Sequence, residues 1–408
     1  MPRMYSSLVL AIVLLALAGL AGGCSSGTQP AAAGCDTPGV TADQVRLGLL
    51  YPDSGPTASS LAAVRAGIDA RLGLANDNGG IHGRKIVYDW RDDQGTTEAN
   101  ATAARDLIEG KQDFGILEYS LAADGSARYL AERDVPVAGL AASDSWSTNR
   151  NMFSFSYTTG SSTDTYGTFV KSRGGTRAVL LTTALSAGVS GAGGRFAASL
   201  RGVGIPVVDQ IGYTANADSP AAIARRLAAT GADTLVTVVG TPDLPAVLRE
   251  LPAAGWTPKV ILSASGYDSE LLADAGGAMT GVVVPLFYRP FEAGGAPITG
   301  YVDAMTRHAP QIANPRQDLA MIGYIDTDLF LRGLQEAGAC PTRRGFVDAL
   351  RSVRSYDAGG LISPIDLSTN LGRPTTCLAF VQANAAGSFD VLDERLCGRE
   401  LPASSATG

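Results

Sequence analysis

The fold is decided by residues 74–108, LANDNGGIHGRKIVYDWRDDQGTTEANATAARDLI. The asparagines and glycines near the start end a helix, because Gly and Asn adopt left-handed backbone angles at little cost. Residues 85–90 alternate in polarity as a strand does, and the polar turn at 92–95 follows. Thr96 or Thr97 can cap the helix that comes next, whose apolar residues have helical spacing. The stretch therefore predicts one helix–strand–helix unit of a parallel sheet.

The same alternation of strand and helix fills most of the chain. It runs through residues 45–140, restarts near residue 163 and continues to residue 263. Strands separated by helices of this length pair in parallel, which predicts an α/β fold with two doubly wound parallel-sheet lobes. Further helices follow between residues 299 and 353, and residues 378–392, LAFVQANAAGSFDVL, predict a closing hairpin.

Composition and charge set the class of protein. The chain has 408 residues, of which 45% are hydrophobic and 17% charged, which is typical of a globular protein of about two domains. Its 32 basic and 39 acidic residues give a net charge of -7. Because no basic run is interleaved with aromatic residues, we expect no nucleic-acid partner.

The N-terminus is predicted to be a targeting segment. After Arg3 comes an apolar run at residues 8–21, which is too short for a membrane span of about 20 residues. Small residues then precede Cys24, an arrangement that resembles the bacterial lipoprotein signal, although Ala21 stands where Leu is usual. We expect a signal peptide at 1–23, lipidation of Cys24 and a flexible tether at 24–40. The alternative is an ordinary cleaved signal peptide with an incidental cysteine.

Four cysteines remain after the signal segment: Cys35, Cys340, Cys377 and Cys397. An even number in an exported protein predicts two disulfides, for which three connectivities exist. The closing hairpin would bring Cys377 and Cys397 together, and a strand start and a helix end on one sheet edge would bring Cys35 near Cys340. We therefore predict Cys35–Cys340 and Cys377–Cys397. A zinc site is the rival, but no two cysteines are close in sequence and the two histidines lie in separate segments.

Four segments in matching order resemble a known family. They are residues 47–56 (LGLLYPDSGP), 76–109 (the opening stretch), 218–243 (DSPAAIARRLAATGADTLVTVVGTPD), and 253–272 (AAGWTPKVILSASGYDSELL) followed by 277–284 (GAMTGVVV). Together they resemble type I periplasmic (solute-)binding proteins of the branched-chain amino-acid type, which serve ABC importers. The resemblance covers nearly all of residues 45–391.

The resemblance implies a domain plan and partners. It implies a first lobe at 41–152 and 288–360, a second lobe at 158–281 and 367–400, and hinge crossings at 153–157, 282–287 and 361–366. It also implies a small ligand held between the lobes and delivered to ABC permease subunits in the membrane. The location expected is the outer face of the cytoplasmic membrane, with the chain a monomer that carries no cofactor and no metal.

Ligands of open parallel sheets bind beyond the carboxyl ends of the strands, near helix N-termini. The candidate ligand-binding residues at these ends are Tyr51, Ser54, Tyr119, Ser120, Ala141, Ala142, Ser143, Thr241, Tyr267 and Asp268. The resemblance implies that groups after the third and fourth strands hold a ligand carboxylate, and Ser120 and residues 141–143 occupy those places. The alternative for Ser120 and Ser143 is a turn or helix-cap role without ligand contact.

Two positions depart from the family's amino-acid pattern. The aromatic residue that often follows the first strand of the second lobe is missing from residues 184–191, ALSAGVSG. Amino-acid binders place an acid after the strand at 260–263 to pair with the ligand ammonium, but residues 264–266 here are Ala-Ser-Gly. Asp268 is the nearest acid, and its alternative role is to cap the helix at 269–274. Because a buried ammonium without a carboxylate is costly, the pattern argues against an ordinary zwitterionic amino acid. An amino-acid-like compound, an amide or a carboxylic acid is expected.

An enzyme is not expected. The chain has only two histidines. The Gly-rich run at 188–196 lacks the spacing of a nucleophile elbow or a phosphate loop, and it predicts a flexible cleft loop before a helix at 194–201. The Asp92-Asp93 pair is predicted to be a solvated turn. The remaining rival is a ligand-sensing module that reports to a membrane receptor. The sequence after the binding domain holds no transmembrane segment, which argues against a one-chain receptor.

Overall fold

The structure, a computed structural model, describes residues 35–55, 58–158, 161–183, 190–240 and 243–402. The predicted signal peptide, Cys24, most of the tether and Thr241 lie outside these residues. Among the described residues, no helix combines the length and the apolar character that a bilayer crossing requires.

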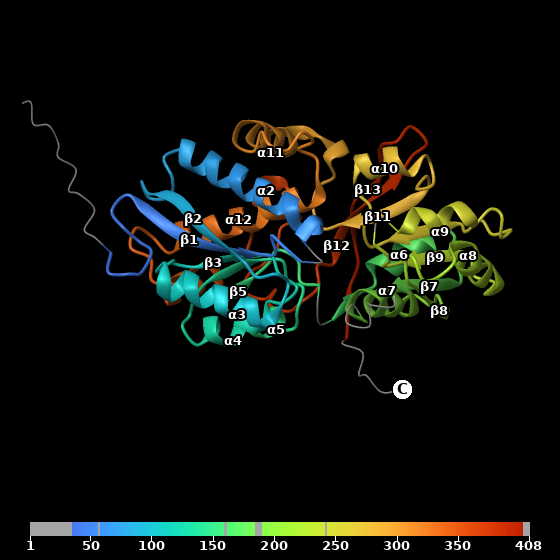
Figure 1. The fold of residues 1–408 in the computed structure, drawn as a ribbon, viewed down its shortest axis with the longest axis horizontal. Helices are drawn as coiled ribbons and strands as arrows, with labels where there is room; N and C mark the ends of the chain where they lie inside the picture. Colours follow the sequence, from blue (N-terminus) through green and yellow to red (C-terminus); the bar gives the residue numbers. More distant parts are fainter. Residues whose placement is uncertain (1–34, 56–57, 159–160, 184–189, 241–242, 403–408) are drawn as a thin grey trace, which may run out of the picture. The chain divides into compact units, whose positions relative to one another are not determined.

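The first lobe is built on a parallel sheet of five strands in the order β2-β1-β3-β4-β5 (Figure 1). Its strands are β1 (Gln44–Tyr51), β2 (Lys85–Asp92), β3 (Ile116–Glu118), β4 (Val137–Gly139) and β5 (Met152–Phe153). β1, β3 and β4 are nearly continuous runs of buried residues, as expected of parallel strands covered on both faces.

Helices cover both faces of this sheet (Figure 1). One face carries α2 (Ala58–Asp77), α11 (Gly295–His308) and α12 (Asp318–Glu336), and the other carries α3 (Thr97–Arg105), the turn η1 (Asp106–Gly110), α4 (Asp124–Ala131) and α5 (Ser145–Thr148). The helix α13 (Arg343–Leu350) follows α12. α2 and α12 pack closely because Gly67 faces the carbonyl of Ala320 and Gly323 faces that of Val64; a Cβ at either glycine would collide with backbone.

The second lobe is built on a sheet of seven strands in the order β13-β12-β11-β10-β9-β7-β8. Five strands pair in parallel: β7 (Ala178–Thr183), β8 (Val207–Tyr213), β9 (Thr234–Thr237), β10 (Val260–Ser263) and β11 (Val282–Leu286). The predicted hairpin, β12 (Cys377–Ala383) and β13 (Phe389–Cys397), extends the sheet with antiparallel pairs. A short pair joins β6 (Ser162–Thr163) to β14 (Glu400–Leu401).

The helices of the second lobe divide between the two faces of this sheet. α6 (Thr165–Ser172) and α7 (Ser190–Gly202) share one hydrophobic cluster with the sheet. α8 (Pro220–Ala229), α9 (Leu244–Glu250) and α10 (Ser269–Ala275) contribute to the cluster on the other face. The Gly-rich run was predicted to be a cleft loop before a helix at 194–201. The helix is confirmed, but it begins earlier, because residues 190–193 already form the first turn of α7.

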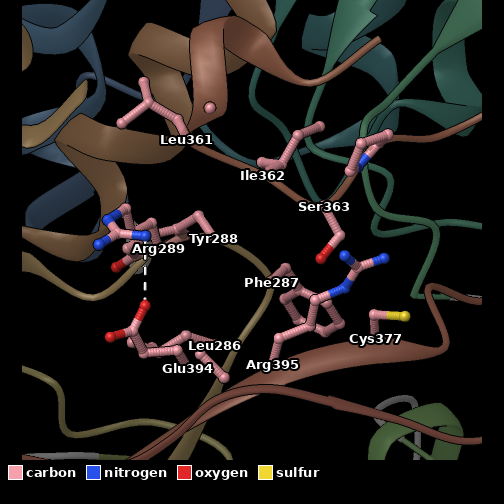
Figure 2. A pocket seen from close by; sticks show the side chains of 13 residues that line it. Leu286, Phe287, Tyr288, Arg289, Leu361, Ile362, Ser363, Cys377, Glu394 and Arg395 are labelled. Atoms are coloured by element: carbon pink, nitrogen blue, oxygen red, sulfur yellow. Dashed lines mark ion pairs between the residues drawn. The ribbon is translucent and has the colours of Figure 1, made fainter. Parts of the chain in front are cut away.

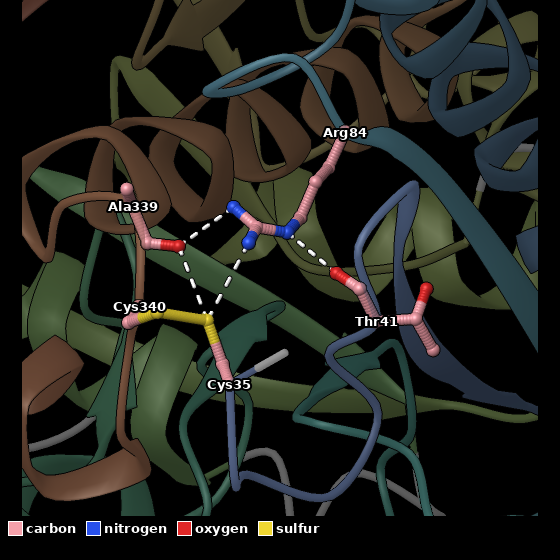
Figure 3. The surroundings of a disulfide bond; sticks show 5 residues. All are labelled: Cys35, Thr41, Arg84, Ala339 and Cys340. Carbon is pink, nitrogen blue, oxygen red and sulfur yellow. Dashed lines mark hydrogen bonds between the residues drawn. A yellow bond between two sulfur atoms is a disulfide. The ribbon is translucent and has the colours of Figure 1, made fainter. Parts of the chain in front are cut away.

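Both predicted disulfides are present, Cys35–Cys340 and Cys377–Cys397. The second joins directly opposed residues of the β12–β13 hairpin. The first lies beside Arg84, a side chain only 2% exposed (Figure 3). Arg84 donates to the carbonyls of Thr41 and Ala339, each over 2.6 Å, and to Cys35 Sγ over 3.4 Å. The disulfide and the Arg84 guanidinium together link the segments that meet where the strands of the first lobe begin.

Two of the three predicted crossings contain residues that pair within a single lobe. Residues 282–287 were predicted to cross, but Val282–Leu286 is β11, paired on both sides inside the second sheet. Residues 361–366 were also predicted to cross, but Ile365 pairs with Tyr356 in the first lobe, and the Leu367 amide donates to the carbonyl of Val353. The chain passes over near Pro374, which pairs with Tyr157 of the first crossing. Long-range backbone pairing, which the local sequence pattern does not contain, sets these positions.

Candidate ligand-binding site

The loop after β1 is tied to the loop after β2. Ser54 Oγ donates to Asp92 Oδ2 over 2.6 Å, and the amides of Asp53, Ser54 and Gln94 donate to Asp92 Oδ1. Burial opposes the charge on Asp92, but these hydrogen bonds outweigh it and lower the pKa of Asp92. Tyr51 donates to Asp53 over 2.6 Å. Tyr51 and Ser54 thus lie at the carboxyl edge of the sheet, as predicted, within a loop that is held by a charged turn.

Asp93 was predicted to be part of a solvated turn, and this prediction is wrong. Its carboxylate is fully buried. It accepts hydrogen bonds from the Gly95 amide and from the side-chain amide of Asn100, each over 3.0 Å, and from the hydroxyl of Ser120. Asp93 therefore joins the loop after β2 to the loop after β3 through donors that come from different elements.

Ser120, predicted to contact a ligand carboxylate, is fully buried within this network. Its hydroxyl donates to Asp93 and accepts from the amide of Ala122 over 3.0 Å. The preceding Tyr119 is also fully buried, and its hydroxyl donates to the carbonyl of Gly323 in α12 over 3.3 Å. In this structure the hydroxyls of Tyr119 and Ser120 both donate to groups of the first lobe itself.

Sequence reasoning missed Glu118, the last residue of β3. Its side chain has no exposed surface and accepts from Asn100 over 2.9 Å. Burial raises its pKa to about 8, against the hydrogen bond from Asn100 and with a further contribution from the charge of Asp93. The sequence signal that could have identified Glu118 is a carboxylate in an otherwise apolar strand.

The loop after β4 carries Ala141, Ala142 and Ser143 at the same edge, because β4 pairs with β3. Ala141 is buried, and its carbonyl accepts from Thr158 over 2.5 Å. Ser143 Oγ lies 3.2 Å from Ser145 Oγ. The seven first-lobe candidates thus share the carboxyl edge of one sheet: Tyr51, Ser54, Tyr119, Ser120, Ala141, Ala142 and Ser143.

In the second lobe the candidates Tyr267 and Asp268 follow β10. Asp268 caps α10, where its carboxylate accepts from the amides of Glu270 over 2.8 Å and Leu271 over 3.3 Å. Tyr267 is only 4% exposed; its hydroxyl donates to Glu292 and accepts from the Phe291 amide over 2.8 Å. Its ring stacks on Phe291 with centroids 5.3 Å apart. The structure therefore gives both side chains partners within the protein.

Two adjoining cavities lie at the crossings, away from all the described candidates. One has a volume of about 200 Å³ and is lined by residues 286–289, 360–364, 377, 379, 394 and 395; the other, of about 230 Å³, is lined by residues of the first and third crossings. They share Ser363, Pro364 and Cys377. In the first, Arg289 pairs with Glu394 over 3.2 Å (Figure 2). Sequence analysis did not anticipate these cavities, because their walls come from segments far apart in the chain.

No group of three or more His, Cys, Asp or Glu side chains that could hold a metal ion occurs in the part of the chain that the structure describes.

Comparisons with known proteins agree with this architecture. A family profile described as periplasmic binding protein matches residues 44–388. A comparison with curated protein sequences gave no match. Among solved structures, a fatty acid ABC transporter substrate-binding protein from Thermomonospora curvata has a TM-score of 0.72 at 17% identity, with 89% of this chain and 95% of that chain covered.

Two further solved structures have the same fold. The leucine-binding protein LivK from Thermotoga maritima has a TM-score of 0.69 at 17% identity, covering 88% of this chain and 98% of that chain. A solute-binding protein of an ABC transporter from R. palustris, in complex with benzoate, has a TM-score of 0.70 at 18% identity and covers 88% and 98%. The profile spans well over half of the chain, and both lobes have the expected sheets. The chain therefore belongs to the periplasmic binding protein family, with the two-lobe fold of its type I members.

Proposed function

We propose that the chain is the lipid-anchored, extracytoplasmic substrate-binding protein of an ABC importer. It binds a small polar organic ligand between its lobes and delivers that ligand to permease subunits in the membrane. The observation that carries the proposal is the pair of parallel sheets whose carboxyl edges hold polar loops, in a chain of the periplasmic binding protein family. Such edges bind small ligands because helix N-termini offer free backbone N–H groups there.

The ligand we propose is an amino-acid-like compound, an amide or a carboxylic acid. The loop after β10 offers only Asp268 to a ligand ammonium, and that carboxylate already caps α10. A buried ammonium needs a carboxylate partner. Solved structures of this fold include proteins described with isoleucine, with benzoate and with 4-hydroxybenzoate, so the fold accommodates carboxylates with and without an ammonium group.

Delivery depends on the difference between the affinities of the ligand for the open and for the closed arrangement of the lobes. A ligand that contacts both lobes stabilises the closed arrangement by the free energy of the added contacts. The candidates Tyr51, Ser54, Tyr119, Ser120, residues 141–143, Thr241, Tyr267 and Asp268 are the positions we propose for these contacts. Lipidation of Cys24 would hold the protein at the outer face of the cytoplasmic membrane, and no chemical turnover takes place.

A thermal-shift screen of the purified full-length chain in detergent tests binding. Amino acids, their amides, short peptides, urea-like compounds and aromatic acids are the probes. We expect at least one of them to raise the melting temperature saturably and to be recovered unchanged. If no probe stabilises the protein, or if one is converted to product, the proposal is wrong.

The membrane partners need separate tests. We expect Cys24→Ser to abolish lipid labelling and to release the protein from the membrane fraction, with Cys24 in the natural chain as the control. Co-purification with permease subunits would support delivery. Co-purification with a receptor instead would favour the sensing role.

A further inference from the structure

Arg195, in the second turn of α7, is a half-buried arginine without a counter-charge. Its backbone carbonyl accepts from Ser162 over 2.9 Å, but its guanidinium makes no hydrogen bond or ion pair with any described residue. Burial lowers the pKa of Arg195, and the nearby Tyr166 acts in the opposite direction. A guanidinium has five donors, and none of those of Arg195 has a partner among the described residues, so a bound anion would offset the cost of its partial burial.

Tyr166, on α6, is the second unpaired donor at this place. It is 5% exposed, and its ring packs edge-on against Phe196, with centroids 4.7 Å apart. Its hydroxyl has no hydrogen-bond partner among the described residues. Two donors without acceptors therefore lie together at one end of the second lobe.

A small cavity joins these donors to all three crossings. Arg195 and Tyr166 line it together with Tyr157 of the first crossing, Phe287 of the second and Pro374 of the third. Its volume is about 10 Å³. That is room for roughly one water-sized group, so the cavity can admit an oxygen atom of a ligand but not a whole organic molecule.

Two carboxylates beside the β6–β14 strand pair, where Ser162 bonds to the Arg195 carbonyl, are already paired. Asp164 accepts from the Arg399 side chain over 3.1 Å, and Glu400 accepts from Arg373 over 2.6 Å and from Ser161 over 2.9 Å. No carboxylate of the described part of the chain therefore pairs with Arg195. An arginine fork beside a phenol hydroxyl suits a carboxylate, which can accept from both.

We propose that Arg195 and Tyr166 form an anion subsite at the hinge end of the second lobe, which takes the carboxylate of a monocarboxylic acid. The inference rests on the proposed function and narrows its ligand class to acids. A carboxylate held there contacts the second lobe and the crossings at once, so its binding is coupled to the hinge. It also explains how a ligand is fixed without an acid after β10 for an ammonium.

Matched probes and variants test the subsite. The full-length chain is titrated with sodium acetate and sodium benzoate at constant ionic strength, and with acetamide and benzamide as uncharged isosteres. Melting temperature is the readout for the natural chain, Arg195→Gln, Arg195→Lys and Tyr166→Phe. Arg201→Gln is the control, because Arg201 lies on the same helix and is exposed.

We expect both carboxylates to stabilise the natural chain and Arg201→Gln saturably, and both amides to bind at least tenfold more weakly. Arg195→Gln should lose the stabilisation. Arg195→Lys keeps the charge without the fork and should retain part of it, and Tyr166→Phe, which keeps the packed ring, should raise the apparent Kd about threefold or more. Equal effects of acid and amide, or equal effects on the natural chain and Arg195→Gln, would overturn the inference.

The outcome can be told apart from that of the proposed function. If the wider screen finds an uncharged ligand that binds Arg195→Gln normally, the subsite is wrong and the binding function stands. If acetate acts through Arg195 but no larger compound binds, the subsite holds a free anion and the binding function fails. Competition between acetate and a larger acid would show that the subsite takes the carboxylate of the transported ligand.

Discussion

The side-chain amide of Asn100 donates to the carboxylate of Glu118 over 2.9 Å, at a place where neither residue has exposed surface. The second oxygen of Glu118 has no hydrogen-bond partner among the described residues. Burial of this carboxyl raises its pKa to about 8. A group whose pKa is raised by folding makes the folded state lose stability as pH rises from the unfolded pKa through the folded pKa.

We therefore expect Glu118→Gln to flatten the pH dependence of stability. The glutamine still accepts from Asn100 but cannot ionise. Between pH 5 and pH 8.5 the natural chain should lose a few kcal/mol more than the variant, on the order of one kcal/mol per pH unit. Melting temperatures at both pH values measure this. Glu132→Gln, at an exposed ion pair, is the control, and equal pH profiles for the natural chain and Glu118→Gln would contradict the prediction.

Arg84 is expected to stabilise the folded first lobe, at the edge where its strands begin. Arg84→Met removes two charge-assisted, partly buried hydrogen bonds, to the carbonyls of Thr41 and Ala339. The cost should be roughly 2–4 kcal/mol. Chemical denaturation with the disulfides intact measures it. Arg307→Met, where the arginine side chain is 65% exposed, should change stability by less than about 0.5 kcal/mol.

The two disulfides should differ in their contribution. Cys35–Cys340 spans 305 residues and Cys377–Cys397 spans 20. In the chain-entropy account, opening the longer loop costs roughly 5–6 kcal/mol and the shorter roughly 3 kcal/mol. Melting temperatures of the double serine variants should fall in that order. A larger loss at the hairpin pair would mean that unfolded-state entropy does not control the difference.

Asp268→Ala is expected to destabilise the second lobe by about 1 kcal/mol, because α10 loses its cap. Asp268→Ser should recover most of that loss, since serine caps helices as well. Thermal unfolding of the three chains gives the stabilities, and titration with a ligand from the screen gives the affinities. If Asp268→Ser is stable but binds at least tenfold more weakly, the carboxylate itself contacts the ligand.

Local signals in the sequence were sufficient for the fold. At the start of α8, for example, Ser219 caps the helix and Pro220 is its first residue, which is a start signal readable from the sequence alone. The hairpin pattern placed Cys377 opposite Cys397 because strand register depends on residues close in the chain. The family resemblance added the two-lobe plan, which the sheets confirm.

The chemistry of the sheet edge could not be predicted in the same way. Asp93 accepts hydrogen bonds from Asn100, seven residues on, and from Ser120, 27 residues on. The Asp92-Asp93 pair looked solvated in the sequence, but Asp93 belongs to a buried polar network. The crossing near Pro374 depends on its pairing with Tyr157, more than 200 positions earlier. The missing counter-charge of Arg195 is a property of the folded surroundings, which no spacing of residues encodes.

The Cys35–Cys340 bond and Arg84 also bear on mechanical load. The chain enters the lobe at Cys35, and Arg84 directly precedes β2, so both lie where the parallel strands of the first sheet begin. Tension applied at Cys35 would pass through a covalent bond to Cys340, in the loop between α12 and α13, as well as along the chain toward β1. The candidate ligand-binding loops lie at the opposite ends of the strands, away from the point where such tension would enter.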